Sequence, residues 1–203
     1  MSTTQVRLVL ASASPARRAT LRAAGICPEI VVSDVDESTY TADTPAELAQ
    51  LLATAKAEAV ATLSIADGAV VVGCDSVLDL DGEALGKPTD AGDAVRRWRS
   101  MRGRSGLLVT GHCVIDTRTG REAAASATTR VTFAELSDEE IAAYVATGEP
   151  LQVAGAFTID GLGGPFVTEI AGDPHNVVGI SLPLLRTMLR DLDVAWTSLW
   201  PAP

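Results

Sequence analysis

The chain has 203 residues, of which 47% are hydrophobic and 21% are charged. This length suits one domain, or two lobes that share a core, and it buries enough surface to fold without disulfides or a structural metal. The formal net charge of −10 opposes broad binding to nucleic acid or to anionic lipid. We therefore expect neither a nucleic-acid nor a membrane partner, while a local basic pocket stays open.

Three features of the sequence indicate a cytoplasmic protein. Cys27, Cys74 and Cys113 have no paired spacing, which is typical of reduced thiols in a reducing compartment. The first apolar stretch is only about six residues long and its arginines follow it, unlike a signal peptide or a membrane anchor. No other run approaches the roughly 20 apolar residues that a membrane-spanning helix needs.

Short β-rich apolar runs alternate with segments of helical period, which predicts an α/β fold. We expect a single domain over residues 1–203, in which the tail from about residue 193 either docks on the core or forms an interface. The predicted strands cover residues 6–11, 29–33, 69–74, 107–116 and 122–133, and residues 79–84 predict a hairpin. The predicted helices cover residues 15–24, 45–63, 91–101, 137–146 and 182–192. The glycine-rich stretch from Gly148 to Gly179 carries little regular signal.

Ser12, Ser14 and Arg17 lie where a predicted buried strand ends and a helix begins. Free backbone N–H groups at a helix N-terminus, two hydroxyls and a guanidinium group together suit a phosphate. The alternative is that Ser14 only caps the helix and that the arginine is solvated. Both interpretations stay open on position alone.

Asp75 follows six apolar or small residues, so we expect it at the carboxyl end of a buried strand, where α/β proteins often bind ligands. Its carboxylate could bind a hard cation or accept a proton from water, or it could only turn the chain. Glu37, in an acidic loop, could be a second metal ligand or simply solvated. Lys56 lies in the apolar arc of its helix between Leu52 and Val60, so its ammonium must reach an edge or meet an anion.

Gly86-Lys87-Pro88 places a lysine on a stiffened chain, which suits a fixed cation aimed at a phosphate, although the tripeptide alone is a weak signal. The sequence contains no G-x-x-x-x-G-K-[ST] pattern, and the glycines at 161–164 do not follow a strand with G-x-G-x-x-G spacing. These observations argue against a P-loop NTPase and a Rossmann dehydrogenase.

Seven collinear motifs carry a resemblance that runs from about Leu8 to Leu185. They are LASASPARR, DES, the helix lysine Lys56, CDSV, GKP, the stretch TGEP…AGAF…DGLGG, and NVVGISL. Together they resemble the Maf family of nucleoside triphosphate pyrophosphatases. The resemblance implies a mixed α/β fold with a central sheet flanked by helices and two lobes around a cleft, related to inosine triphosphate pyrophosphatases. It also implies hydrolysis of a nucleoside triphosphate to the monophosphate and pyrophosphate with a divalent cation, Mg²⁺ or Mn²⁺.

The resemblance assigns roles residue by residue. Asp75 matches the family's proton acceptor, Ser12, Ser14 and Arg17 match its phosphate site, and Glu37, Lys56 and Lys87 match its acidic and basic cleft residues. The implied metal ligands are Glu37 and Asp75, and the implied catalytic cations are Lys56 and Lys87.

Departures from the family pattern concern the base. The branch that acts on dTTP and UTP typically has an arginine, a lysine, a tyrosine and a glutamine where this chain has Ala16, Val153, Phe157 and Asp160. An acidic Asp160 could favour a cationic methylated base such as 7-methyl-GTP, or could cap a turn, while other motifs look more like the pyrimidine branch. The alternative function is a non-catalytic regulator of septum formation that binds nucleotide or a partner. Related members are often homodimers, but no interface can be read from this sequence.

Overall fold

A single seven-stranded mixed sheet organises the computed structural model, which describes residues 6–201. The strand order is β2-β1-β3-β5-β6-β7, and β4 pairs with β3. The strands are β1 (Leu8–Leu10), β2 (Glu29–Ile30), β3 (Val70–Leu80), β4 (Glu83–Leu85), β5 (Ser105–Asp116), β6 (Arg121–Phe133) and β7 (Val167–Ala171). β1 runs parallel to β2 and β3, whereas the other pairs are antiparallel. The predicted α/β class is confirmed.

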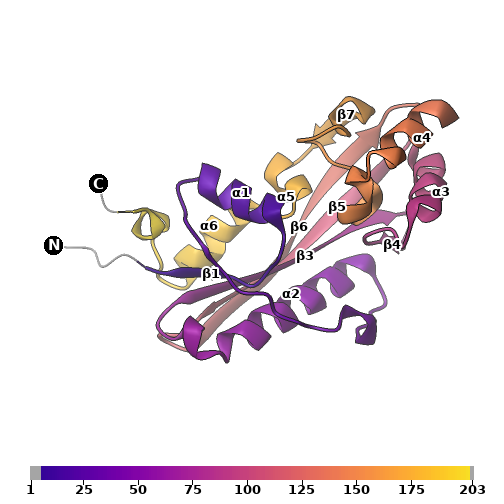
Figure 1. The fold of residues 1–203 in the computed structure, drawn as a ribbon. Helices are drawn as coiled ribbons and strands as arrows, with labels where there is room; N and C mark the ends of the chain where they lie inside the picture. The colour runs from indigo at the N-terminus through magenta and orange to yellow at the C-terminus, as the bar shows by residue number, and fades with distance from the viewer. Residues whose placement is uncertain (1–5, 202–203) are drawn as a thin grey trace.

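Helices cover both faces of this sheet (Figure 1). They are α1 (Pro15–Ala23), α2 (Pro45–Ala61), α3 (Ala91–Met101), α4 (Asp138–Ala146), α5 (Pro174–Val178) and α6 (Leu182–Asp191). Helix α2 lies on one face, and α1, α5 and α6 lie on the other (Figure 1). Ser14, Thr44 and Ser137 cap their helices as predicted, and the last two form full capping boxes. No helix in residues 6–201 has the length and apolar character needed to cross a membrane.

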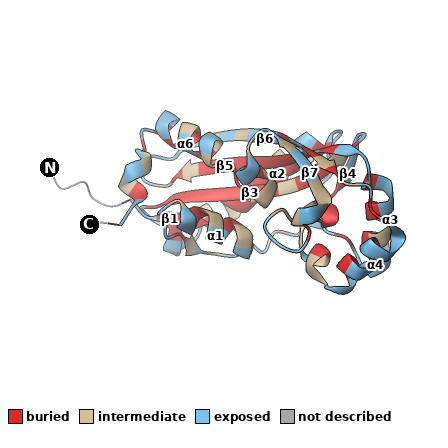
Figure 2. Cartoon of the chain, turned by 90° about the horizontal axis from the view of Figure 1, so that it is seen from above, coloured by how far each residue is buried: buried red, intermediate tan, exposed pale blue. Residues whose placement is uncertain are grey.

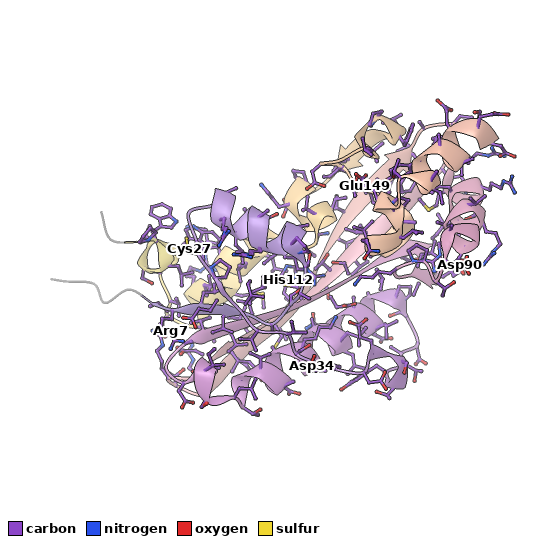
Figure 3. All side chains as sticks on the ribbon, viewed as in Figure 1. Arg7, Cys27, Asp34, Asp90, His112 and Glu149 are labelled. Carbon is purple, nitrogen blue, oxygen red and sulfur yellow. The ribbon has the colours of Figure 1, made fainter. Side chains whose placement is uncertain are left out.

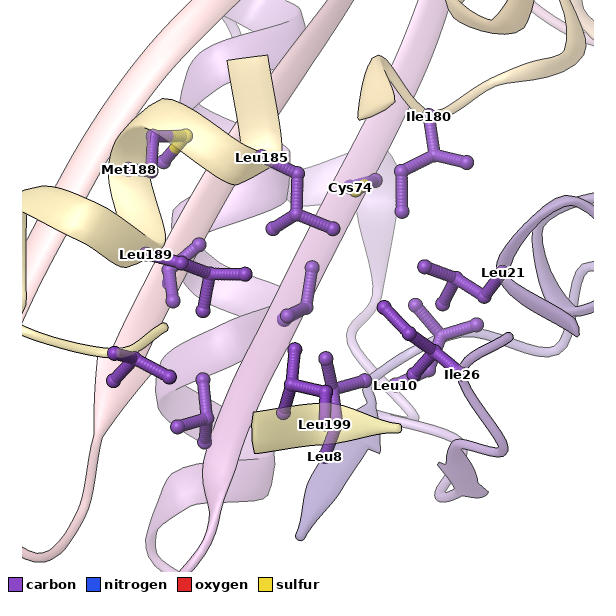
Figure 4. Packing of buried hydrophobic residues seen from close by; sticks show 14 of the residues in the cluster. Leu8, Leu10, Leu21, Ile26, Cys74, Ile180, Leu185, Met188, Leu189 and Leu199 are labelled. Atoms are coloured by element: carbon purple, nitrogen blue, oxygen red, sulfur yellow. The ribbon is translucent and has the colours of Figure 1, made fainter. Parts of the chain in front are cut away.

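The side chains of β3 alternate between these two faces. Val71 packs with Ala57 and Val60 of α2. Its neighbour Val72 packs on the opposite face with Leu21 and Leu185, in the cluster drawn in Figure 4. This alternation decides which helix each polar residue further along β3 will face.

Two glycines allow α2 to approach the sheet closely. A Cβ added at Gly73 would lie 2.3 Å from the backbone oxygen of Ala53, and one at Gly111 would lie 2.3 Å from that of Ala49. No side chain larger than hydrogen fits at either position without moving the helix. The close approach therefore belongs to the way that α2 is held over β3 and β5.

Two hydrophobic clusters lie at opposite ends of the long strands. One surrounds Leu10 and Leu185 at the β1 end, and the other surrounds Trp98 and Phe133 at the β4 end. Both draw residues from β3 and β5, whose central parts are buried (Figure 2). The chain thus has two lobes that share one sheet.

The edge of β3 between these lobes lacks a strand partner. β1 pairs with Val70 to Val72, and β4 pairs with Leu78 to Leu80. Residues 73–77 consequently pair with β5 on one edge and with no described strand on the other. We call this segment the β3 gap.

Two expectations from the sequence are corrected here. The strand predicted to end at residue 74 continues to Leu80, so Asp75 lies within β3 and not at its end. Asp75 pairs with Gly111 of β5, and this partner keeps the chain extended through a polar residue. In addition, the stretch 148–179, which carries little regular signal, contains β7 and α5.

The carboxyl-terminal tail packs on the core up to the end of the described chain. Leu199 is buried in the cluster at the β1 end. Trp200 donates a hydrogen bond from Nε1 to the carbonyl of Ala24, at 3.0 Å, and its ring lies against Gly25. The tail therefore braces the carboxyl end of α1.

Candidate active site

Consecutive residues of the β3 gap present polar groups to opposite faces of the sheet. Asp75 has the parity of Val71 and Gly73 and faces α2, whereas Ser76 has the parity of Val72 and faces α1 and α5. Lys56 of α2 contacts Asp75, and Arg17 of α1 contacts Ser76. The β3 gap thus has a lysine on one face and an arginine on the other.

On the α2 face, one ammonium group joins two carboxylates. Lys56 Nζ lies 2.5 Å from Asp75 Oδ1 and 2.6 Å from Glu37 Oε1. Glu37 begins a 3₁₀ turn, Glu37–Thr39, which the side chain of Asp36 caps. The loop that leads to this turn, with Asp34 labelled, runs beside α2 in Figure 3. The Lys56 ammonium thus meets two anions, which is one of the two alternatives left open by the sequence.

Burial sets the protonation behaviour of Asp75. Only 8% of Asp75 and 8% of Lys56 is exposed. Desolvation raises the pKa of the Asp75 carboxyl above its usual value, while the charges of Lys56 and Arg17 oppose that rise. The nearby carboxylate of Glu37 adds to it. A carboxylate with a raised pKa accepts a proton more readily, which is the property of a general base.

On the α1 face, Arg17 is held by neutral oxygens. Its Nε donates to the carbonyl of Gly179 at 2.7 Å, Nη1 donates to Ser12 Oγ at 3.1 Å, and Nη2 donates to Ser76 Oγ at 3.0 Å. Ser14 accepts from the backbone N–H of Arg17 at 3.3 Å, as a helix cap. The guanidinium is buried, and no carboxylate of the described residues forms an ion pair with it. A buried cation without a charged partner suits an anionic ligand such as phosphate.

Lys87 comes from the far end of the β3 gap. β4 ends at Leu85, which is opposite Leu78, and Lys87 follows two residues later. Its side chain is exposed and contacts neither Asp75 nor Glu37. The structure therefore brings Lys87 to the region of the site but does not join it to the carboxylates.

Asp160 lies apart from this group. It is exposed and lines a hollow of about 330 Å³ with His175 and residues of α1, among them Ala19 and Thr20. The imidazole of His175 lies beside Asp173, with Nδ1 at 3.1 Å from Asp173 Oδ1. Asp75 faces α2 while this hollow lies against α1 on the other face of the sheet (Figure 1), so the structure does not bring Asp160 and Asp75 together.

The donor set for a metal is limited to two carboxylates. Within residues 6–201 no group of three or more His, Cys, Asp or Glu side chains is arranged to hold a metal ion. Glu37 and Asp75 nevertheless converge on one cation, the Lys56 ammonium. Mg²⁺ is commonly held by one or two carboxylates together with substrate phosphates, so these residues fit an ion that arrives with a polyphosphate.

Sequence reasoning missed three contributors to the site. Ser76 and Thr110 are hydrogen-bonded across β3 and β5 at 2.9 Å, and the carbonyl of Gly179 holds Arg17. Ser76 follows Asp75 directly in the CDSV motif, and Gly179 lies in NVVGISL, so the motifs contained two of them. Thr110 carries no sequence signal, because its role depends on strand pairing.

A buried carboxylate, two buried cations and a helix N-terminus at a break in strand pairing are groups that suit a phosphate ligand. A family model described as Maf-like protein matches residues 7–192. A nucleoside triphosphate pyrophosphatase of Streptomyces coelicolor is 62% identical over 194 residues, which cover 96% of this chain and 94% of that protein. A protein of the same name from Thermosynechococcus vestitus is 54% identical over 187 residues, covering 92% of this chain and 94% of that protein. The chain belongs to the Maf-like family, which confirms the resemblance found in the sequence.

Proposed function

We propose that this chain is a nucleoside triphosphate pyrophosphatase, which hydrolyses a nucleoside triphosphate to the monophosphate and pyrophosphate. The observation that best supports this proposal is the ion pair between the buried Asp75 and Lys56 at the β3 gap. Arg17 lies on the opposite face of the same strand. The names of the relatives from Streptomyces coelicolor and Thermosynechococcus vestitus support the same reaction. The proposed setting is the free nucleotide pool of the cytoplasm.

The proposed binding step uses the cations and the start of α1. Arg17 and the N–H groups beside Ser12 and Ser14 bind phosphate oxygens, since a helix N-terminus and a guanidinium both favour anions. Lys56, beside Asp75 in the middle of the β3 gap, and Lys87, which follows β4, offset further negative charge. Transfer of this kind depends mainly on positioning and on stabilisation of charge.

In the proposed chemical step, Asp75 removes a proton from a water molecule. The water oxygen forms a bond to the α-phosphorus, and the bond from that phosphorus to the pyrophosphate oxygen breaks. The proton passes to Asp75, and pyrophosphate leaves with the electron pair of the broken bond. The raised pKa of the Asp75 carboxyl favours this proton transfer.

We further propose a divalent cation, Mg²⁺ or Mn²⁺, that Glu37 and Asp75 would hold together with phosphate oxygens. The ion supplies neutralisation of triphosphate charge and orientation of the phosphates. Asp160 is proposed to contact the base from its hollow beside α1, with dTTP, UTP and 7-methyl-GTP as the candidate substrates.

The test compares the wild type with Asp75→Asn and a matched control, Asp79→Asn. Asp79 lies on the same strand and accepts from the N–H of Gly82 through Oδ1, an atom that asparagine keeps. Each protein is incubated with dTTP, UTP, CTP, GTP or 7-methyl-GTP, with Mg²⁺, with Mn²⁺ or with a chelator, and the products are separated by chromatography. We expect monophosphate and pyrophosphate from the wild type and from Asp79→Asn only, and no products in chelator.

Other outcomes contradict parts of the proposal. Stoichiometric nucleotide binding without release of pyrophosphate would favour the regulator, and release of orthophosphate would indicate attack at the γ-phosphorus. Full turnover in chelator would remove the metal from the proposal and leave the reaction in place.

A further inference from the structure

Asn176 is completely buried below the site, and its side chain ties α5 to two strands. Nδ2 lies 3.1 Å from the carbonyl of Leu108, 3.3 Å from that of Ala127 and 3.2 Å from Thr129 Oγ1. These acceptors belong to β5 and β6. A five-residue helix has little stability of its own, so the amide fixes the place of α5 on the sheet.

The amide is costly as a packing group. Asn176 Oδ1 is buried and has no hydrogen-bond partner in the described part of the chain. A buried acceptor without a partner destabilises the folded state. An apolar residue would avoid that cost, so the donors of the amide, which hold α5, account better for an asparagine here.

The backbone carbonyl of Asn176 accepts two hydrogen bonds that both lead to Arg17. It accepts from the backbone N–H of Gly179 at 3.0 Å, and from Thr110 Oγ1 at 3.2 Å. The first bond, together with one from the same N–H to the carbonyl of His175 at 3.2 Å, holds the backbone of Gly179 at the end of α5, and the Gly179 carbonyl accepts from Arg17 Nε at 2.7 Å. Gly179 has φ +113°, and a Cβ there would lie 3.1 Å from Arg17 Nε. The turn that brings this carbonyl to Arg17 therefore favours glycine strongly.

The hydrogen bond from Thr110 to the Asn176 carbonyl begins a chain of hydrogen bonds in which each donor and acceptor is fixed. The single hydroxyl hydrogen of Thr110 is donated to Asn176, so Thr110 must accept from Ser76 across their 2.9 Å contact. Ser76 must then accept from Arg17 Nη2, which can only donate. Arg17, Ser76, Thr110 and Asn176 are thereby connected in a single order of donor and acceptor.

We propose that Asn176 is a positioning residue, which orients the Arg17 guanidinium toward the β3 gap through Gly179 on one side and through Thr110 and Ser76 on the other. Two of the three hydrogen bonds of the Arg17 guanidinium, those to Gly179 and Ser76, thus depend on where α5 is held, and the third goes to Ser12. The assignment rests on the proposed function for its effect on turnover, but the orientation of Arg17 can be tested without substrate.

The first measurement is NMR of the Arg17 Nε–H group in ¹⁵N-labelled protein, assigned by its loss in Arg17→Lys. Thr110→Val removes the hydroxyl link with little change of volume, and Thr110→Ser restores it. Asn176→Asp removes the amide donors and serves as the second variant. We expect exchange of the Arg17 Nε–H with water to be about tenfold faster in Thr110→Val and in Asn176→Asp, and near the wild-type rate in Thr110→Ser. Unchanged exchange in folded Thr110→Val overturns the proposal, even where Asn176→Asp fails to fold.

The second measurement is kinetic. A misplaced Arg17 should lower kcat/KM for the preferred nucleotide by about tenfold in Thr110→Val, with recovery in Thr110→Ser. In an Arg17→Lys background the same substitution should change kcat/KM or, where turnover is too low to measure, the Kd for inorganic pyrophosphate by less than about twofold. Additive effects in the two backgrounds would contradict action through Arg17. A wild type without turnover, whose Arg17 exchange still responds to Thr110→Val, would reject the proposed function and retain the positioning role.

Discussion

The Lys56 ammonium lies 2.5 Å from Asp75 and 2.6 Å from Glu37, so a cation on α2 joins a strand carboxylate to a loop carboxylate. Lys56 and Asp75 are both buried, whereas the side chain of Glu37 is 56% exposed. The pair formed by Lys56 and Asp75 is therefore the part of the site with the strongest mutual dependence. Removing Lys56 leaves the buried Asp75 carboxylate without its cation, whereas removing Asp75 leaves Lys56 paired with Glu37.

Asp75→Asn should lower turnover by about 10² to 10⁴ while the protein stays folded. Its stability at pH 7 should be at least that of the wild type. A carboxyl with a raised folded-state pKa stabilises the protein below its unfolded pKa, and this contribution is lost as the pH rises through the folded pKa. Steady-state kinetics check the predicted turnover, and urea unfolding checks the predicted stability. Near wild-type turnover in a folded variant would remove Asp75 as the base.

Lys56→Met should move the acid limb of the pH profile of kcat/KM to higher pH. Without the ammonium, the pKa of the Asp75 carboxyl should rise further, because the nearby positive charge lowers it. Lys56→Arg keeps the charge and is the matched control, with a smaller movement of the limb. A limb that stays in place in Lys56→Met would mean that another group controls it.

His112 should make the protein sensitive to acid. Burial lowers the pKa of its imidazole to about 4, and its Nε2 accepts from the backbone N–H of Ser181 at 2.9 Å. The unfolded chain binds this proton near pH 6.5, so the stability is present above that pH and is lost as the pH falls toward 4. The loss is roughly 3 kcal/mol from this group.

The measurement for His112 is urea unfolding between pH 7 and pH 4. The wild type should lose stability across this range, and His112→Gln should show a shallower slope. Equal slopes would show that carboxyl groups, and not His112, set the acid response.

Gly73→Ala should destabilise the fold by about 1–3 kcal/mol, since its Cβ would collide with the backbone of α2. Because α2 carries Lys56, we also expect lower turnover. Gly86→Ala is the matched control, since a Cβ there meets nothing within 4 Å and Gly86 has no positive φ. The measurement compares the free energies of unfolding of Gly73→Ala and Gly86→Ala. A Gly73→Ala protein as stable as the control would show that α2 can move away without cost.

Local signals predicted most helix starts. Ser14, Thr44 and Ser137 cap α1, α2 and α4 because capping depends on residues within one turn. The position of Lys56 in the apolar arc left two outcomes, an ammonium that reaches an edge or one that meets an anion, and the structure has the second. The sequence could not name its partners, since Asp75 and Glu37 lie 19 residues on either side of it.

Features that depend on long-range pairing were not predictable. β3 continues past Asp75 because β5, which begins only at Ser105, pairs with it as far as Asp79. β7 forms against β6, although its own segment is rich in glycine. Thr110 belongs to the site only through its register with Ser76. In each case the deciding contact is distant in sequence and leaves no local pattern.

The β3 gap also bears on aggregation. An open strand edge is a template on which a second chain can add a strand. Here the open edge is limited to residues 73–77, since β1 and β4 close it at both ends. At about 3.4 Å per residue this leaves roughly 17 Å of free backbone, which β1 and β4 enclose on both sides. The interruption beside Asp75 is thus closed at both ends, so a second chain cannot pair along the whole length of β3.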